Sequence, residues 1–376
     1  MTEYRKALPH EEADILDFIN CIFSMAKKPH DFKKLGPKVY NHEGFHRYHY
    51  VAVEEGRIRG TVAVLPLEMP LGGGEVLKIG YVGSVSVHPY HRGHGCMKEL
   101  MNMMLRDAGK QYDLLVLGGQ RQRYQYYGFE GGGSRLTFEV TQKNVRHALA
   151  DVETKIKLRK IECLKDASLD EIHAMCAAQP MTCVRDRGIF LDIMRMWESE
   201  LYALEDENGL QGYLYAMGND YAAEIGLKDE SRIGEVIKAF MQQTGEKKIT
   251  VWADPLNRIR ANYIRQFCDD FSLSDSEMLR VINWKHTLEA LLRYKAECVP
   301  LLDGRFVFEV EDERFAIEIK DHAVSVRETA DQPDMVMTRL KAQEFFFSPY
   351  TAWMTVSPLL KSWLPVPFAV YPADGF

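Results

Sequence analysis

The chain has 376 residues, of which 46% are apolar and 27% charged, a balance typical of globular proteins. At roughly 150 residues per domain, this length predicts two or three domains. The net charge of −7, without any basic block, argues against nucleic acid as a partner.

The cysteines and the N-terminus predict where the protein works. Seven cysteines are scattered without a C-x-x-C pair, which suits a reducing compartment and implies no zinc site. The charged N-terminus lacks the apolar core of a signal peptide. The longest apolar-looking run, Phe345 to Leu360, is interrupted by prolines and is shorter than the roughly 18 residues that a membrane span requires. We therefore expect a cytoplasmic protein that uses neither a metal nor a membrane.

Residues 1–150 predict a first mixed α/β domain. It begins with a short strand at Tyr4–Leu8 and an amphipathic helix from about Glu11 to Met25, followed by an irregular segment, Lys27–His49. Two hairpins then run from Tyr50 to Val87 with turns rich in glycine. An antiparallel meander of this kind is expected to lead into the most informative stretch of the chain.

That stretch, Gly80 to Leu105, predicts a strand, a glycine-bearing turn and a helix. Glycines let the main chain approach a ligand closely, and the first free N–H groups of a helix face whatever lies before it, so the turn suits a diphosphate. A dinucleotide-binding loop is excluded because Lys98 stands where a third glycine is needed, and a P-loop is excluded because no Gly-Lys-Ser/Thr is present. A plain turn between strand and helix is the structural alternative.

The turn resembles motif A of the GNAT acetyltransferases, R-x-x-G-x-G/A after a V-x-V-x-P strand, which cradles the pyrophosphate of acetyl-CoA. Arg92 and Gly95 match this motif, and Met97 replaces its last small residue. The resemblance implies a GNAT fold for the first domain.

A second motif follows the apolar strand at Asp113–Leu117. The run Tyr124 to Phe129 has the form Y-x-x-x-G-F, which resembles the second GNAT signature, in which a helix places a tyrosine beside the thioester sulfur. A tyrosine of pKa about 10 stays protonated at neutral pH and can serve a thiolate leaving group as donor. Tyr124 matches the catalytic position, whereas a purely core role fits Tyr126 or Tyr127 better.

Two further domains are predicted from the change of pattern along the chain. Residues 151–283 repeat the succession of strand, helices, hairpin and strand, but Lys228-Asp229-Glu230 stands where a phosphate loop would be, and its carboxylates would repel a diphosphate. We interpret this as a degenerate GNAT-like domain. Residues 284–376 predict a helix, three alternating strands and a second helix, an α+β arrangement that resembles a sterol-carrier-like domain.

The order of these three domains resembles the Eis-type (enhanced intracellular survival) acetyltransferases. This resemblance implies an acetyl-CoA-dependent N-acetyltransferase that acts on primary amines of aminoglycosides, polyamines or lysine-like acceptors and assembles as a hexamer. It also implies that main chain and loop residues at three places hold the cofactor: Val85, Ser86 and Val87; Arg92, Gly93, His94, Gly95, Cys96, Met97 and Lys98; and Gly119 and Gln120.

In the Eis-type family the chain's own C-terminal carboxylate reaches the active site, and here that group belongs to Phe376. An ammonium acceptor must lose a proton before it attacks, and a carboxylate moved out of water has its pKa raised toward a useful value. The closing segment from Pro365 contains three prolines and ends on an aromatic residue, which predicts a packed tail in place of a frayed one. An ordinary chain end is the alternative.

Three hypotheses from different classes therefore stand. The favoured one is an N-acetyltransferase that forms a ternary complex, with direct attack of the amine on the thioester. The second is a lipid or hydrophobic-ligand carrier with a vestigial first domain, and the third is a non-catalytic acetyl-CoA sensor. The intact Arg92 and Gly95 turn argues against the carrier, and Tyr124 with a terminal base argues against the sensor.

Overall fold

The computed structural model describes residues 2–25 and 28–376, so that Lys27, the start of the segment predicted to be irregular, lies outside the described residues. The chain divides into two compact units. The first comprises Met1–Gly132, Glu277–Val366 and Phe376, and the second comprises Gly133–Ser276 and Pro367–Gly375. Each unit is described by itself.

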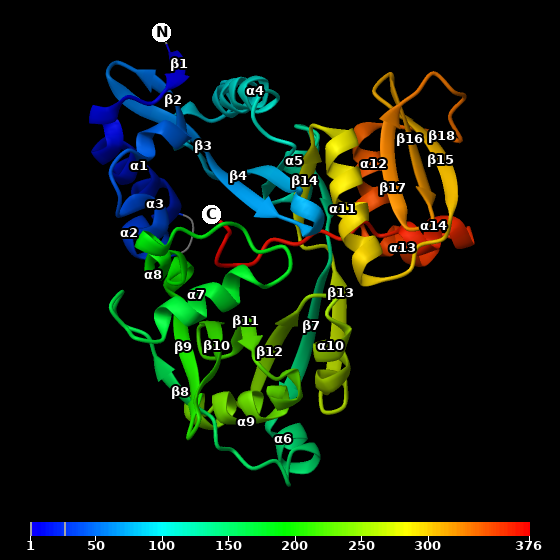
Figure 1. Ribbon diagram of the computed structural model, residues 1–376. Helices are drawn as coiled ribbons and strands as arrows, with labels where there is room; N and C mark the ends of the chain where they lie inside the picture. Colours follow the sequence, from blue (N-terminus) through cyan, green and yellow to red (C-terminus); the bar gives the residue numbers. More distant parts are fainter. Residues whose placement is uncertain (1, 26–27) are drawn as a thin grey trace. The chain divides into compact units, whose positions relative to one another are not determined.

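A seven-stranded sheet organises the first unit (Figure 1). Its order is β1-β2-β3-β4-β5-β14-β6, and among its described strands only β4 and β5 pair in parallel. The strands are β1 (Glu3–Lys6), β2 (His49–Glu54), β3 (Arg57–Pro70), β4 (Val76–Val87), β5 (Leu114–Leu117), β6 (Glu130–Gly132) and β14 (Glu277–Val281). The predicted meander into the motif strand is therefore confirmed.

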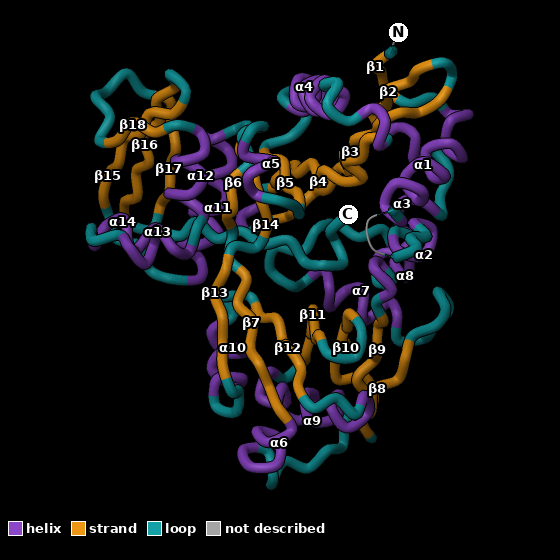
Figure 2. The backbone as a smooth tube through the Cα atoms, turned by 180° about the vertical axis from the view of Figure 1, so that it is seen from behind, coloured by secondary structure: helices purple, strands orange, loops and turns teal. Residues whose placement is uncertain are grey.

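Helices α1 (Glu12–Ser24) and α4 (Cys96–Ala108) lie on opposite faces of this sheet (Figures 1 and 2). The buried face of α4 consists of Leu100, Met101 and Met104, which pack against Val62 and Val82 of the sheet. Burying each such side chain contributes about 1.5 to 3 kcal/mol. The rest of the segment predicted to be irregular contains the short helices α2 (Phe32–Leu35) and α3 (Pro37–Tyr40).

The segment from Phe129 to Val140 is divided between two different sheets. The first half is β6, and the second half begins β7 (Arg135–Thr141). Gly133 between them has φ +73°, a conformation that glycine adopts without strain. The chain leaves the first sheet at Gly132, earlier than the boundary expected near residue 150, and returns to it as β14, which the sequence did not indicate.

The second unit contains its own seven-stranded sheet, of order β13-β7-β12-β11-β10-β9-β8 (Figure 2). The strands other than β7 are β8 (Lys157–Lys160), β9 (Glu200–Asp206), β10 (Gly209–Met217), β11 (Tyr221–Leu227), β12 (Lys248–Ala253) and β13 (Asp270–Ser274). Helices α6 (Gln142–Ala148), α7 (Leu169–Ala177), α8 (Phe190–Ile193), α9 (Ile233–Thr244) and α10 (Arg258–Arg265) complete the unit. The hairpin, the long helix α9 and the strand β12 confirm the predicted succession.

Pro367–Gly375, near the end of the chain, is tied to the second unit by a buried ionic network. Arg185 donates to Asp374 from Nε at 2.8 Å and to Glu224 from Nη2 at 2.8 Å, and Tyr213 donates to the same Glu224 at 2.6 Å. All four side chains are buried. Removing one partner of such a network leaves an uncompensated buried charge, which costs about 3 to 5 kcal/mol. The packed tail predicted from the prolines is therefore confirmed for these residues.

The third sheet, of order β17-β16-β15-β18, belongs to the first unit. Its strands are β15 (Gly304–Val310), β16 (Glu313–Lys320), β17 (Ala323–Glu328) and β18 (Met335–Met337), and helices α11 (Trp284–Cys298), α12 (Arg339–Phe347), α13 (Pro349–Met354) and α14 (Pro358–Trp363) accompany them. Its interior is filled by aromatic rings, with Phe308 and Phe346 4.7 Å apart. Among the described residues, no helix is both long and apolar enough to cross a bilayer.

Candidate active site

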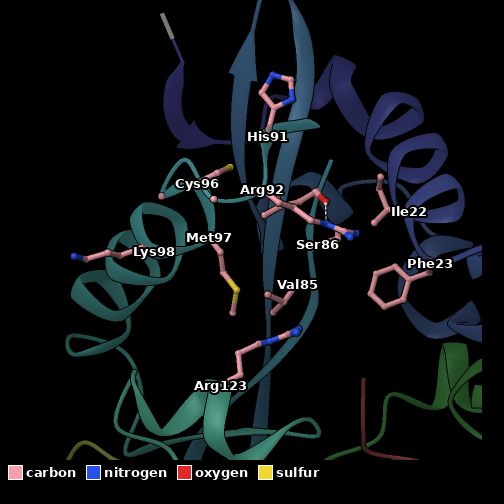
Figure 3. Close-up of a pocket in the computed structure, with 13 residues that line it drawn as sticks. Ile22, Phe23, Val85, Ser86, His91, Arg92, Cys96, Met97, Lys98 and Arg123 are labelled. Carbon is pink, nitrogen blue, oxygen red and sulfur yellow. Dashed lines mark hydrogen bonds between the residues drawn. The ribbon is translucent and has the colours of Figure 1, made fainter. Parts of the chain in front are cut away.

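A pocket of about 500 Å³ lies where β4 ends and α4 begins (Figure 3). Its walls come from the end of β4, from the turn and first residues of α4, from α1, and from α5 (Arg121–Gln125). The lining residues are Ile22, Phe23, Val85, Ser86, Val87, His91, Arg92, Gly93, Gly95, Cys96, Met97, Lys98 and Arg123. Nine of the predicted cofactor-binding residues therefore share one cavity.

The main chain of β4 is exposed to this pocket because β4 and β5 diverge. The two strands pair only from Ile79 to Tyr81, and beyond Tyr81 no described strand pairs with that edge of β4. The pairing of β3 with β4 also shifts, so that one extra residue of β4 is accommodated near Ser84. A bulge of this kind bends a strand and re-aims the residues that follow it. Main-chain groups of Val85 to Val87 are thus available to hydrogen-bond an extended amide-bearing ligand.

The turn itself has the conformation that an anion site requires. Gly93 and Gly95 have φ +80° and +79°, and a Cβ at either position would meet no atom of the described residues within 4 Å. Glycine is therefore required for the left-handed main chain, and the space beside it is open to a ligand. Gly95 caps α4, a helix of 13 residues, whose first amides have no partner within the helix. These amides and the positive end of the helix dipole favour a phosphate.

The charge of the pocket agrees with that ligand. Four basic residues line it and none of its described lining residues is acidic. Arg92 donates from Nε to the Val87 carbonyl at 3.3 Å, which leaves its remaining donors for an anion. Figure 3 shows Arg92, Arg123 and Met97 extending into the space between α4 and α1, whereas the Lys98 side chain points away from it. Lys98 can therefore contribute through its amide, but its ammonium group lies outside the pocket.

Cys96 is a structural residue of this site. Its side chain is buried, and a Cβ on Gly60 would lie 2.7 Å from its sulfur. Burial, reinforced by the charge of Glu54, raises the pKa of the Cys96 thiol to about 11. The thiol therefore stays protonated at neutral pH and is a poor nucleophile.

Tyr124 lies on α5 and is not among the described residues that line the pocket. It is 7% exposed, and a Cβ on Gly119 would lie 2.4 Å from its ring. Its ring meets that of Phe129 edge-on, with 6.4 Å between the ring centroids. Burial raises the pKa of Tyr124, so its phenol holds its proton at neutral pH. The side chain of its neighbour Arg123 lines the pocket in its place. Of the two tyrosines expected to fit a core role better, Tyr127 is buried, whereas Tyr126 is 66% exposed, so the expectation is wrong for Tyr126.

Phe376 is packed by residues of the first unit. Its ring lies 6.1 Å from that of Tyr40, and its Cδ1 would be 2.4 Å from a Cβ on Gly83. Gly83 immediately precedes the bulge of β4, so the last residue of the chain is close to the strand that forms the pocket. Its predicted role as a base stays a prediction.

The structure leaves three predicted cofactor residues outside the lining of the pocket, namely His94, Gly119 and Gln120. Conversely, Ile22, Phe23, His91 and Arg123 line the pocket and were not indicated by the motif. A basic residue directly before the motif tyrosine was a signal that could have identified Arg123. Nothing in the sequence linked α1 to the pocket, because its position there depends on packing across the sheet. No cluster of three or more metal-ligand side chains occurs among the described residues.

In the second unit, the loop at the corresponding position carries acidic side chains that bond to groups of the unit itself. After β11, the Asp229 carboxylate accepts from the Ser231 amide at 2.9 Å, and Glu230 accepts from the buried Arg260 guanidinium at 2.8 Å. The amides that a phosphate would need face a carboxylate here. This observation supports the interpretation of residues 151–283 as a domain that does not hold the cofactor, which stays a proposal.

The geometry above is that of a CoA-dependent acyltransferase: a strand that diverges from its neighbour, a glycine turn, and a helix N-terminus in a pocket that Arg92 and Arg123 line. Residues 3–131 match the family model described as an acetyltransferase (GNAT) domain. The match confirms the predicted enzyme class for this domain, an acyl-CoA-dependent N-acetyltransferase, and with it the predicted GNAT fold. The comparison with curated proteins found no match.

Solved structures similar to the whole chain have the same fold. A GCN5-related N-acetyltransferase from Anabaena variabilis aligns with TM-score 0.72 and 17% identity, and a probable N-acyltransferase from Enterococcus faecalis aligns with TM-score 0.71 and 13% identity. Eis1 from Mycobacterium abscessus aligns with TM-score 0.64 and 16% identity. Each alignment covers 100% of both chains. At these identities the likeness is one of fold.

Proposed function

We propose that the protein transfers the acetyl group of acetyl-CoA directly to a primary amine within a ternary complex. The observation that carries this proposal is the pocket at the start of α4, with open left-handed glycines, free helix amides and the side chains of Arg92 and Arg123. Acetyl-CoA, when bound, supplies an activated thioester. The Arg92 and Arg123 guanidinium groups and the amides from Gly93 to Lys98 would hold its phosphates. Main-chain groups of Val85 to Val87 would hold its amide-bearing arm.

Tyr124 is assigned as the donor to the departing sulfur. Its raised pKa keeps the phenolic proton in place until negative charge develops on the thiolate. Cys96 keeps its proton as well, which disfavours a route through an acylated cysteine and favours direct attack by the amine. The carboxylate of Phe376 is assigned as the base that takes the proton of the ammonium acceptor.

The finer identity that we propose is an Eis-type enzyme, consistent with the full-length likeness to Eis1 from Mycobacterium abscessus. On that basis the acceptors are amines of aminoglycosides, polyamines or lysine side chains, the assembly is a hexamer and the location is the cytoplasm. The domains are a GNAT domain at 1–150, a GNAT-like domain at 151–283 and a sterol-carrier-like domain at 284–376. The aromatic filling of the third sheet supports a structural role for the last domain over lipid carriage.

The proposal is tested by measuring release of CoA from acetyl-CoA with a panel of aminoglycosides, polyamines and lysine-containing peptides. Turnover that depends on both acetyl-CoA and one amine class is expected. Calorimetry with acetyl-CoA alone separates the hypotheses. Binding without turnover on any amine would indicate a sensor, and no binding at all would overturn the assignment of the pocket.

A further inference from the structure

Ser84, the residue at the bulge of β4, has a main-chain conformation that its side chain disfavours. Its φ is +50°, in the left-handed region where glycine is the usual occupant, yet the residue is a buried serine. A non-glycine residue stays in this region only where surrounding contacts hold it there. Ser84 directly precedes Val85, Ser86 and Val87, which line the acyl-CoA pocket. The contacts that keep Ser84 in this conformation therefore determine the direction of the main chain at Val85 to Val87.

The contact that holds Ser84 comes from Tyr40 at the end of α3. The Tyr40 hydroxyl is 2.7 Å from Ser84 Oγ and 3.3 Å from His49 Nε2, while His49 Nδ1 is 2.9 Å from the Phe45 carbonyl oxygen. Tyr40 and His49 are 2% and 0% exposed, so water does not compete for these bonds. The chain of three bonds joins the segment after α1, the first residue of β2 and the bulge of β4.

The direction of these bonds follows from the groups involved. A carbonyl oxygen can only accept, so His49 Nδ1 donates to Phe45 and the neutral ring presents Nε2 as an acceptor. Tyr40 then donates its one proton to Nε2, and Ser84 donates to the Tyr40 oxygen. Each of the three bonds therefore has one defined direction, so the bonds specify a single arrangement of the bulge.

We infer that Tyr40 is a positioning residue for the acyl-CoA site. Its hydroxyl, fixed by His49, holds Ser84 in the left-handed conformation and so turns the main chain of Val85 to Val87 toward the pocket. The inference rests on the proposed function only for the identity of the ligand. Tyr40 itself is not among the residues that line the pocket, so its effect passes through β4.

Substitutions at Ser84 separate positioning from a general loss of packing. Ser84→Ala and Ser84→Gly both remove the hydroxyl, but only alanine retains the side chain that disfavours positive φ. Tyr40→Phe and Ser84→Ala should each weaken acetyl-CoA binding about tenfold, the scale of one lost buried hydrogen bond. Ser84→Gly, and the double variant Tyr40→Phe with Ser84→Gly, should bind within about threefold of wild type.

The matched control is Tyr50→Phe. Tyr50 is a buried tyrosine of β2 whose hydroxyl donates to Asp107 at 3.0 Å, outside the acyl-CoA pocket, so its loss should leave acetyl-CoA affinity unchanged. At saturating acetyl-CoA the Tyr40→Phe variant should keep kcat within about threefold of wild type, because positioning of the cofactor strand acts mainly on binding. A folded Tyr40→Phe variant with wild-type affinity, or a defect that Ser84→Gly does not relieve, would overturn the inference.

A second measurement does not depend on acetyl-CoA. Hydrogen exchange of the ligand-free protein should be faster in the segment 82–87 of Tyr40→Phe than in wild type or Tyr50→Phe, because the bulge loses its tether. Equal exchange in all three proteins would contradict the inference. If wild-type protein bound no acetyl-CoA, the proposed function would fail, whereas the exchange comparison would still decide whether Tyr40 holds the bulge.

Discussion

The ring of Phe376, the last residue of the chain, occupies the space where a side chain on Gly83 of strand β4 would begin. A Cβ on Gly83 would be 2.4 Å from Cδ1 of that ring, closer than carbon atoms approach in proteins. Because the ring sits at the strand that lines the pocket at the start of α4, the smallest side-chain change at Gly83 displaces the Phe376 ring.

Gly83→Ala should therefore lower turnover strongly while acetyl-CoA binding stays within a few-fold of wild type. The added methyl group must push the Phe376 ring aside, and such overpacking typically costs about 1 to 3 kcal/mol. Phe376→Leu in the same background supplies a smaller side chain and should recover part of the activity. Turnover of Gly83→Ala equal to that of wild type would show that the position of Phe376 is unimportant for catalysis.

Extending the C-terminus tests the terminal carboxylate itself. A carboxylate that acts as base must lie within hydrogen-bond reach of the amine or of a bridging water, and added residues move it away. We expect a C-terminal tag to reduce kcat by about 10²-fold or more, the scale of general-base catalysis. The same tag at the N-terminus is the control. Equal kcat for both tagged proteins would assign the base to another group.

Tyr124→Phe should lower kcat far more than it weakens acetyl-CoA binding, because the phenol is needed only when charge develops on sulfur. General-acid assistance is typically worth about 10²- to 10⁴-fold. Tyr126→Phe serves as the matched control, since Tyr126 is a surface residue two positions along the chain. If the single-turnover rates of the two variants differed by less than a factor of two, Tyr124 would not be the donor.

Arg92→Ala combined with Gly95→Glu should abolish acetyl-CoA binding in a protein that still folds. Gly95 has φ +79° with open space beside it, so a glutamate there places bulk and a negative charge where the phosphate would bind. The comparison is Gly209→Glu, also at a positive-φ glycine with open space but in the second unit, which should bind normally. Calorimetric affinity in the double variant equal to wild type would contradict the phosphate site.

His49 should make the stability of the first unit depend on pH below neutrality. Burial lowers the pKa of His49 from 6.5 to about 4, opposed by its bond to Phe45 and by the charge of Glu12, while the charge of His46 lowers it further. Between pH 6.5 and 4 the His49 side chain is protonated in the unfolded chain but stays neutral in the folded chain. The stability present above pH 6.5 is thus lost progressively as pH falls toward 4, at about 1.4 kcal/mol per pH unit.

Native-state hydrogen exchange of β2 at pH 7 and pH 5, corrected for intrinsic rates, measures this loss. His49→Gln keeps one acceptor and one donor without a titrating ring, so its opening free energy should vary less between the two pH values. The difference from wild type should be about 2 kcal/mol. An identical pH dependence in both proteins would show that His49 does not exclude a proton.

The sequence by itself determined the parts of the site that are local. The strand ending near Pro89, the turn from Arg92 to Gly95 and the helix after it are encoded within about 25 residues, because β-branched residues, glycine and helical spacing each act over a few positions. The motif tyrosine, Tyr124, was found in the same way. The presence of three sheets with accompanying helices could likewise be anticipated. The signals were the alternation of apolar and polar residues in strands, the turns between strands and the spacing of apolar residues in helices.

Tertiary structure alone decided the parts that depend on distant residues. Segments far apart in the chain meet where β14 joins the first sheet, where Phe23 lines the pocket and where Phe376 packs against Gly83. No short sequence pattern encodes such pairings. The left-handed Ser84 could not be predicted either, since a serine normally disfavours that conformation. It is held by Tyr40, 44 positions away, and only the folded core brings the two hydroxyl groups within hydrogen-bond distance.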